Sequence, residues 1–349
     1  MSHWEAQPPP PKLAPPLALG WAVNPGIGLI TLRPVGDGSV AVVAAEGITS
    51  LDLADGRVRW HQRGPGDVLD LTATRAGPVA VHFDGRQAHL VALDWEGERL
   101  WQTAMDLALG GNSLRGLGDR LLIQGVPLAP EGGPVCRVLA AATGDVLEEF
   151  GLDGDLPHRV PRGWVFTYIA DDPAQISLDL LAIPEGQRVR LLRFAHDTRT
   201  VVGEVVVISR FPTADDPGRI AAVDTNREET LWTAQGGPNL VLGADGTHVA
   251  NVAAADGQHL SMVLHALRSG EVDWHSAPVA GTVATLMLAA DAVLAEVDNL
   301  LLYVFERTTG ALLQTIEEPS SLVSGAYVTA SGLVDVCGHE VRLLAGSAP

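Results

Sequence analysis

The sequence predicts an all-β protein, and more specifically an eight-bladed β-propeller built from four-stranded blades. Three observations lead to this fold class. One hairpin turn recurs along the chain at a nearly constant spacing, segments with the periodicity of an amphipathic helix are missing, and the two chain ends each carry part of one blade. The ring is therefore expected to close by the N-terminal strand joining the C-terminal blade.

The recurring turn is clearest between Leu90 and Trp101, where an apolar strand leads through a turn containing Gly97 into a strand that carries a tryptophan. A glycine or asparagine marks the same turn seven times, at Gly56, Gly97, Gly144, Gly186, Asn226, Gly270 and Gly310. These marker residues accept the positive φ that tight hairpins need. Their spacing of 40–47 residues is typical of four-stranded propeller blades.

Each repeat also contains one strand that is apolar on both faces, as in residues 40–44 and 205–208. Such a strand is expected where neighbouring blades cover both sides of a sheet. Eight runs of this kind occur along the chain, which matches the eight predicted blades. The 38 glycines and 23 prolines agree with a protein made of short strands and frequent turns.

The two chain ends supply the last blade. Residues 1–16 are rich in proline and are expected to form an extended polyproline or disordered tail, so that residues 17–349 make a single propeller domain. Residues 17–23, which include Trp21, look like an outer strand without the three strands that should precede it. Residues 322–345 supply three strands without a fourth. Pairing the two ends closes the ring and removes two exposed sheet edges.

The charge of the chain limits the classes of partner. A formal net charge of −19 argues against nucleic acid and anionic lipid, because both reward clustered positive charge. The only lysine is Lys12, so the predicted ring has no lysine for a Schiff base or a phosphate loop. Neither a long apolar run nor a signal peptide is visible, so we expect a cytoplasmic protein without membrane insertion. Cys136 and Cys337 fall in different predicted blades and are expected to be free thiols.

The pattern of Asp94, Gly97 and Trp101 resembles the repeat of quinoprotein-type (PQQ-like) β-propellers. In that family the outer-strand tryptophan packs between adjacent blades, and the resemblance implies this role for Trp21, Trp60, Trp101, Trp232 and Trp274. The family includes quinoprotein alcohol dehydrogenases and the propeller lipoprotein of the outer-membrane assembly machinery. The chain has no adjacent cysteine pair of the dehydrogenase type and no lipobox cysteine before Cys136. The resemblance therefore carries over the fold and neither function.

The sequence contains no His-Glu-x-x-His, Cys-x-x-Cys, Gly-x-Ser-x-Gly or phosphate-loop motif. We therefore predict that the protein is not an enzyme and that it has no cofactor and no resident metal. What departs from the repeat is a set of long insertions in blades three to six, in connections that a propeller places on one face: residues 125–134, 170–175, 211–218 and 254–258. Insertions confined to one face often form a binding surface.

Two Asp-Asp-Pro sequences stand out in these insertions. Asp171 and Asp172 precede Asp215 and Asp216 by 44 residues, which is one blade, so the two pairs are expected to be neighbours. They are either ordinary turn residues or an acidic patch that binds an Arg/Lys-rich partner or a hard cation such as calcium.

A second group of polar residues is expected near the mouth of the central channel: His158, Arg159, His196, Asp197 and Arg199. His196 and Asp197 could act as an acid–base pair, but adjacent residues on a strand point to opposite faces. Solvated rim charges and strand-end hydrogen bonds are the alternative. Together with the four aspartates, this group is the predicted partner-binding patch.

Three hypotheses for function follow. The first is a non-catalytic protein–protein interaction scaffold that uses the loop-rich face and binds a partner with a basic surface. The second is the propeller component of a bacterial system that combines a MoxR-type ATPase with a von Willebrand A-like protein. The third is a propeller that binds a small ligand or a metal, or acts as an enzyme, in its central channel. The oligomeric state stays open, and a monomer is compatible with the fold.

Overall fold

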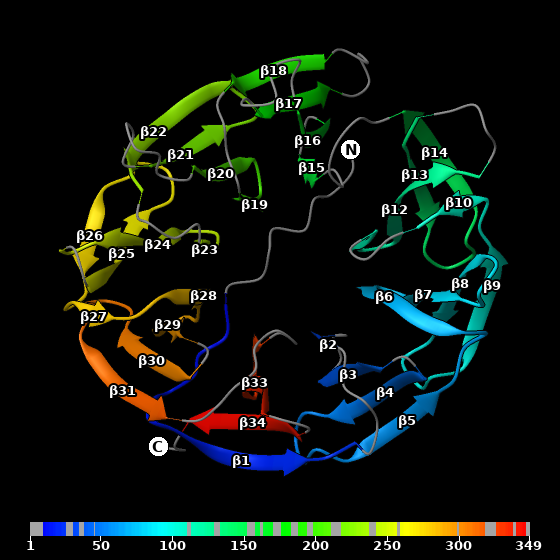
Figure 1. Ribbon diagram of the computed structural model, residues 1–349, viewed down its shortest axis with the longest axis horizontal. Helices are drawn as coiled ribbons and strands as arrows, with labels where there is room; N and C mark the ends of the chain where they lie inside the picture. The colour runs from blue at the N-terminus through cyan, green and yellow to red at the C-terminus, as the bar shows by residue number, and fades with distance from the viewer. Residues whose placement is uncertain are drawn as a thin grey trace.

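In the computed structural model, the described residues are 10–25, 31–34, 38–44, 46–109, 113–128, 133–151, 158–160, 163–169, 176–182, 188–193, 198–210, 218–236, 242–256, 259–298, 300–317, 326–337 and 340–346. Within these ranges the chain forms strands and turns, and it contains no helix that could cross a membrane. The strands make eight antiparallel sheets that follow one another around a ring (Figure 1). The predicted all-β, eight-bladed propeller is confirmed.

The first four blades contain the strands from β2 to β18. Blade 1 has β2 (Thr31–Pro34), β3 (Ser39–Ala44), β4 (Gly47–Asp52) and β5 (Val58–Gln62). Blade 2 has β6 (Asp67–Thr74), β7 (Gly77–Phe83), β8 (Ala88–Leu93) and β9 (Arg99–Ala104). Blade 3 has β11 (Leu114–Leu117), β12 (Arg120–Pro127), β13 (Val135–Ala140) and β14 (Val146–Gly151), with the short β10 (Leu107–Ala108) beside β12. Blade 4 has β15 (His158–Val160), β16 (Gly163–Ile169), β17 (Ile176–Ala182) and β18 (Arg188–Arg193).

The other four blades contain the strands from β19 to β34 together with β1. Blade 5 has β19 (Thr198–Val202), β20 (Val205–Arg210), β21 (Arg219–Asp224) and β22 (Glu229–Gln235). Blade 6 has β23 (Leu242–Ala244), β24 (His248–Ala254), β25 (His259–Ala266) and β26 (Val272–His275), with β27 (Val279–Ala280) beside β25. Blade 7 has β28 (Val283–Leu288), β29 (Ala292–Val297), β30 (Leu301–Glu306) and β31 (Leu312–Glu317). Blade 8 has β32 (Tyr327–Thr329), β33 (Gly332–Cys337), β34 (Glu340–Gly346) and β1 (Leu17–Val23).

The order of the strands defines two faces of the ring. In each blade the chain runs in antiparallel steps from the inner strand at the channel to the outer strand at the rim (Figure 1). Connections between second and third strands, and connections between blades, therefore lie on one face, here called the loop face. The turns between first and second strands and the marker turns lie on the opposite face, here called the turn face. Blades 3 and 6 have a fifth strand because the connections that contain β10 and β27 pair with β12 and β25.

Strand β1 closes the ring, as predicted. It pairs antiparallel with β34, in a register that runs from Leu17 opposite Gly346 to Val23 opposite Val341. In Figure 1 the two strands lie side by side, although they come from opposite ends of the chain. The N-terminal strand is thus the outer strand of the blade whose other three strands are the last in the sequence.

The hydrophobic core is divided among the interfaces between blades. At the interface of blades 6 and 7, Val252 and Met262 belong to one buried cluster with Val293. At the interface of blades 8 and 1, Val334 and Val42 share another cluster. Because neighbouring blades cover both sides of a second strand, every residue of β3 and of β29 is buried. This arrangement explains why the second strands are apolar on both faces.

Outer-strand tryptophans join neighbouring blades. The indole Nε1 donates to a backbone carbonyl in the marker turn of the next blade: Trp21 to Leu53 (3.1 Å), Trp60 to Trp95 (2.8 Å), Trp101 to Ala141 (2.8 Å), Trp232 to Leu267 (2.8 Å) and Trp274 to Arg307 (2.7 Å). The marker glycine lies against the ring, since a Cβ atom at Gly97 would lie 2.6 Å from Trp60. With a φ of +85°, Gly97 also has a backbone conformation that other residues rarely adopt. The marker turn and the tryptophan are two separate features of the repeat in the sequence. In the structure they form one contact between neighbouring blades.

The junction of blades 7 and 8 uses a different contact. Blade 8 has no marker turn, because its outer strand comes from the other end of the chain. Gln314 stands four residues after Gly310, at the position where Trp60 follows Gly56. Its Nε2 donates to the carbonyl of Leu17 at 2.9 Å, and its Oε1 accepts the N–H of Leu17 at 2.6 Å. One side-chain amide thus bonds both backbone groups at the start of β1.

Replacing Gln314 with leucine should lower the free energy of unfolding by about 2 kcal/mol, because two part-buried hydrogen bonds are lost at about 1 kcal/mol each. Urea denaturation of the full chain measures the loss. Gln102→Leu, at an exposed hydrogen bond on the outer strand β9, is the matched control and should change stability by less than about 0.5 kcal/mol. Equal losses in the two variants would contradict a closing role for Gln314.

A buried ionic cluster lies at the same junction. Nε and Nη2 of Arg342 donate to the two carboxylate oxygens of Asp335, at 2.9 and 2.6 Å. Asp335 and Arg342 are buried, and so is Glu296 of β29. Burial and, after it, the Glu296 carboxylate raise the pKa of Asp335 to about 7. Two acidic side chains of adjacent blades therefore disfavour each other's charge at this junction.

Glu296→Gln should change how stability depends on pH. A carboxyl whose pKa is higher in the folded chain than in the unfolded chain loses its stabilising contribution as the pH rises, here from about 4 to about 7. The variant removes one cause of the raised pKa. We therefore expect its Tm, relative to that of the wild type, to increase between about pH 4 and about pH 7.

Two buried histidines change stability with pH in the opposite direction, in the wild type and in the variant alike. Burial lowers the pKa of His82 and of His265, so their contribution to stability is lost as the pH falls below about 6.5. Because the wild type and the variant share these histidines, their effect cancels in the difference between the two Tm values. A difference that stays constant across this pH range would contradict the role assigned to Glu296.

Candidate functional site

Most of the predicted partner-binding patch lies outside the described residues. This applies to Asp171, Asp172, Asp215, Asp216, His196 and Asp197. The backbone of His158 and Arg159 belongs to β15, and that of Arg199 belongs to β19, which are the inner strands of blades 4 and 5. The side chains of these three residues lie outside the described part of the structure. The candidate site is therefore built from the described residues of the loop face and the turn face.

On the loop face of blades 2 and 3, four large apolar side chains are exposed: Leu69 (40%), Phe83 (39%), Val126 (46%) and Leu128 (57%). Leu69 lies at a bulge of β6, where the pairing with β7 shifts between Val68 and Asp70. A bulge adds a residue without a direct partner and redirects its side chain. Phe83 is the last residue of β7, at the same end of the blade. We call these four residues the apolar loop-face set.

The added strand β10 positions the part of this set that belongs to blade 3. Ala108 pairs with Val126, and the N–H of Leu128 donates to the carbonyl of Asp106 at 2.9 Å. Leu107 is buried in the cluster between blades 2 and 3 and anchors β10. Val126 and Leu128 are therefore exposed on an ordered segment that is tied to the core.

Carboxylates lie next to the apolar loop-face set. Asp84 follows Phe83 and accepts hydrogen bonds from the N–H of Gln87 at 2.8 Å, from His89 at 3.0 Å and from the N–H of Arg86 at 2.9 Å. These bonds lower the pKa of Asp84 to about 2, so the carboxylate is ionised at neutral pH. A hydrogen bond from Arg137 likewise lowers the pKa of Asp106, which is ion-paired with that arginine. Acidic side chains thus lie beside the apolar loop-face set.

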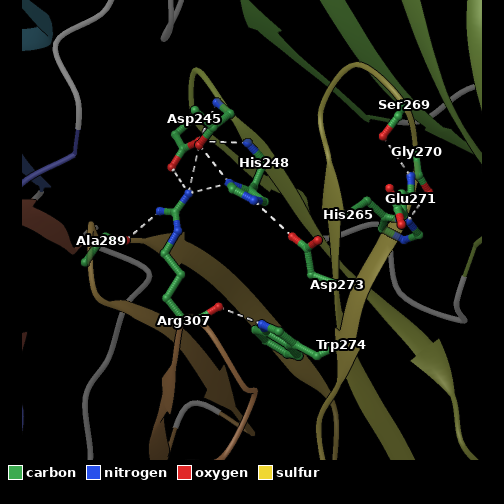
Figure 2. A network of polar contacts seen from close by, with 11 residues as sticks. Asp245, His248, His265, Ser269, Gly270, Glu271, Asp273, Trp274, Ala289 and Arg307 are labelled. Carbon is green, nitrogen blue, oxygen red and sulfur yellow. Dashed lines mark hydrogen bonds and ion pairs between the residues drawn. The ribbon is translucent and has the colours of Figure 1, made fainter.

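On the turn face, a network of polar side chains joins blades 6 and 7 (Figure 2). Arg307 lies in the marker turn of blade 7, with Nη2 2.5 Å from Oδ2 of Asp245 and Nη1 donating to the carbonyl of Ala289 at 2.6 Å. Asp245 also accepts the N–H groups of Thr247 and His248, at 2.8 and 2.9 Å. Burial acts to raise the pKa of Asp245, but these hydrogen bonds outweigh it and lower the pKa. The network is an ion pair between two blades.

The arrangement of His248 resembles a catalytic His–Asp pair but leaves no ring nitrogen for a substrate. Its Nε2 lies 2.9 Å from Oδ2 of Asp273, while its Nδ1 lies 2.9 Å from Nη2 of Arg307 and 2.7 Å from Oγ1 of Thr247 (Figure 2). A general base must be within hydrogen-bond reach of the proton that it removes. The contacts of both nitrogens of His248 are therefore structural.

His265 is held in the same way. It is buried, its Nε2 lies 3.0 Å from Oδ1 of Asn251, and its ring stacks on Trp232 with centroids 5.4 Å apart. Burial lowers its pKa, so the ring is neutral at physiological pH. Among the described residues, no group of three or more histidine, cysteine, aspartate or glutamate side chains could hold a metal ion.

The inner strands carry a further set of polar contacts around the channel. Nη1 of Arg33 in β2 lies 3.2 Å from the hydroxyl of Tyr327 in β32. Asp70 in β6 is buried and accepts the N–H groups of Leu71 and Leu114, at 2.9 and 3.1 Å. Burial raises the pKa of Asp70 in spite of these bonds and of the charge of Arg33. These contacts join the inner strands of blades 8 and 1 and those of blades 2 and 3.

Sequence reasoning missed the polar residues that join blades. Arg307 and Gln314 could have been found by aligning the repeats, because each replaces an apolar or aromatic residue of several other blades. Asp291, which bonds residues near the N-terminus, gives no such signal, since an aspartate is common in turns. The bulge that exposes Leu69 is also not visible in the pattern of the sequence.

Comparison with known proteins agrees with the geometry of the ring. The family model of the outer membrane protein assembly factor BamB matches residues 12–175. BamB from Moraxella catarrhalis is similar in structure, with a TM-score of 0.64 and 15% identity over 94% of this chain and 97% of that one. Quinohemoprotein alcohol dehydrogenase ADHIIG from Pseudomonas putida has a TM-score of 0.56 and 13% identity, over 95% of this chain and 77% of that one. The matched family model and these two structures support a β-propeller of the PQQ-like type.

The chain is also similar in structure to a yeast protein. Sqt1 from Saccharomyces cerevisiae has a TM-score of 0.58 and 10% identity, over 97% of this chain and 100% of that one. No curated protein matches the chain by sequence. At identities of 10–15% these likenesses show the fold alone.

Replacing Arg307 with leucine should destabilise the propeller by about 3 kcal/mol, because it leaves the buried Asp245 carboxylate without its partner. Leucine is the residue at the corresponding position of other marker turns, as in Leu53 and Leu267, so the loss reports the charge rather than the shape of the side chain. The double variant Asp245→Ala/Arg307→Leu should recover most of the loss in urea denaturation. Losses that simply add in this double-mutant cycle would contradict the coupling.

Proposed function

We propose that this PQQ-like propeller is a non-catalytic scaffold that binds another protein through its loop face. The observation that carries the proposal is the apolar loop-face set, four large side chains that are 39–57% exposed at the same end of two adjacent blades. Clustered exposed apolar side chains mark interaction sites more often than scattered ones do. Burying one such side chain contributes about 1.5–3 kcal/mol, so a few of them are enough to anchor a partner.

The two faces of the ring differ in what their side chains do. On the turn face, Arg307, Asp245 and His248 bond one another and hold adjacent blades together. On the loop face, Leu69 and Leu128 are presented to solvent on strands or segments that are paired to the core. A surface that is ordered before it binds loses little conformational entropy on binding. This difference favours the loop face as the binding surface.

The charge of the chain suggests the chemistry of the partner. With a net charge of −19, and with ionised carboxylates such as Asp84 beside the apolar loop-face set, the face attracts a partner that presents basic and apolar side chains together. The connections that contain Asp171, Asp172, Asp215 and Asp216 belong to the same face by their place in the repeat, and would extend the acidic surface over blades 4 and 5.

The absence of catalysis is part of the proposal. It is supported by His248 and His265, whose ring nitrogens are engaged in contacts within and between blades. It is supported further by Asp70 and Arg33, which bond neighbouring inner strands. A scaffold needs these groups for rigidity, whereas a general acid or base must be directed at a substrate.

Affinity capture from a cell lysate, read out by mass spectrometry, tests the proposed function. A Phe83→Ser/Leu128→Ser variant should lose a protein that the wild type captures, and charge reversal of Asp171, Asp172, Asp215 and Asp216 should weaken the capture. The matched control is Leu100→Ser/Leu147→Ser, which removes side chains of similar exposure (46% and 50%) from outer strands. Identical sets of captured proteins for wild type, variants and control would contradict a binding role for the loop face.

A further inference from the structure

Residues 10–14 fill the place on the turn face where blade 8 would otherwise carry a marker turn. In blade 1 this place is taken by a turn whose Leu53 is buried. In blade 8 the buried side chain is Leu13, which is 2% exposed and belongs to the same cluster as Leu17 and Leu344. In Figure 1 the dark blue chain runs past blade 7 before β1 begins. A segment that precedes the first strand thus replaces an element of the repeat.

Asp291, in the turn between β28 and β29, binds the backbone of this segment. Its two carboxylate oxygens accept the N–H groups of Leu13 and Ala14, each at 2.8 Å. The N–H of Ala290 donates to the carbonyl of Pro11 at 2.8 Å. Hydrogen bonds to an ionised carboxylate are stronger than neutral ones, and a proline is accepted at position 11 because only its carbonyl is used. The contacts recognise a short peptide segment by its backbone.

Gly346, the last residue of β34, lies directly against this segment, and we call the surface beneath the segment the groove. A Cβ atom at this position would collide with the carbonyl oxygens of Leu13 and Ala14. Gly346 pairs with Leu17 in the sheet, so its place in the structure is fixed by the ring and not by residues 10–14. A residue without a side chain is therefore what allows the segment to lie on the ring at this point.

We propose that residues 10–14 are a strap that can leave the ring, and that the groove beneath it is a docking site for an extended Pro-x-Leu peptide segment. In the resting chain the protein's own Pro11-Lys12-Leu13 supplies that segment. Asp291 and Ala290 bind its backbone, and the apolar pocket of Leu13 selects the leucine. A partner with the same spacing competes with the strap for the groove.

The strap can open while the ring stays closed, because the two are held by different contacts. Strand β1 is held by its pairing with β34 and by Gln314, and both sets of contacts begin at Leu17. The strap is held by Asp291, by Ala290 and by burial of the Leu13 side chain. Local opening of a segment with few contacts requires less free energy than unfolding of the sheet beside it.

Lys12 makes this opening measurable. It is the only lysine in the sequence, so a lysine-specific protease can cut the chain only after Lys12. The bond that is cut leads to Leu13, whose N–H is bonded to Asp291 and whose side chain is buried. Asp291→Asn and Gly346→Ala should each raise the cleavage rate of the full chain by about tenfold or more, while Tm falls by no more than about 3 °C.

The matched control for this experiment is Asp119→Asn, in the corresponding turn of blade 3, where the carboxylate pairs with the exposed Arg75. This variant should leave the cleavage rate unchanged. Equal cleavage rates in the wild type and in Asp291→Asn would overturn the strap. If the cleavage rate increased only to the extent that the whole ring became less stable, cleavage would report global unfolding. That result would overturn the independence of the strap from the ring.

A fluorescent peptide with the sequence of residues 10–16 tests the groove itself. It should bind the full-length Leu13→Asp chain, whose own strap cannot fill the pocket, and should not bind the wild type. The same peptide with Leu13→Asp should bind neither chain. Adding Gly346→Ala to the host should weaken binding by about tenfold or more, measured by fluorescence anisotropy.

No binding of the peptide to a folded Leu13→Asp chain would overturn the docking site. If Leu13→Asp lowers the Tm or changes the circular dichroism of the ring, Leu13→Gly serves as the host, because it empties the pocket without adding a charge. Binding of the peptide to wild type and variant with the same affinity would also overturn the proposal, since it would place the peptide at another site. The experiment is independent of the loop face, so its outcome does not depend on the proposed scaffold function.

Discussion

The rest of the structure depends on one contact, the packing of an outer-strand indole against the marker turn of the next blade. A four-stranded blade has two apolar faces and cannot bury either of them alone, so each blade is stable only between two neighbours. The indole Nε1 of Trp274 bonds the carbonyl of Arg307 at 2.7 Å, and Gly310 lies so close to the ring that a Cβ atom would be 2.5 Å away. This contact sets the position of neighbouring blades at the rim, which allows the buried clusters to pack further in.

A chain with two ends cannot make this contact at every junction. Where the ends meet, the marker turn is missing, and polar side chains take over its role. Gln314 bonds both backbone groups of Leu17, and Arg342 bonds Asp335 inside the same interface. Amides and ion pairs are directional and reach backbone groups that an indole cannot, but they must be desolvated to be buried. The stability of the junction that closes the ring therefore depends on buried charges.

The sequence predicts the parts of this fold that repeat and not the parts that occur once. Marker turns such as Gly97 and their tryptophans recur seven and five times, so their spacing shows the number of blades and the closure of the ring. Gln314 acts on Leu17, which is 297 residues away, and the order of residues around it does not show that pairing. Leu69 is exposed by a bulge in β6, a local shift of pairing that the pattern of apolar residues does not encode. The candidate binding surface therefore had to be found in the structure, whereas the face on which it lies follows from the repeat.

On the turn face, successive junctions between blades use the same kind of contact. An acidic residue in the turn between first and second strands meets a group of the next blade: Glu204 with Arg268, Asp245 with Arg307, and Asp291 with the backbone N–H groups of Leu13 and Ala14. In the first two junctions the partner is an arginine that belongs to a marker turn, so the contact is present whenever the blade is folded. In the third the partner is a segment that precedes β1 and belongs to no strand or marker turn. Since carboxylates of this face already bond the next blade, the ring can leave apolar side chains such as Leu128 exposed on the loop face without weakening its junctions. The contacts that join blades on the turn face and the proposed binding surface thus lie on opposite faces, and the strap lies on the turn face.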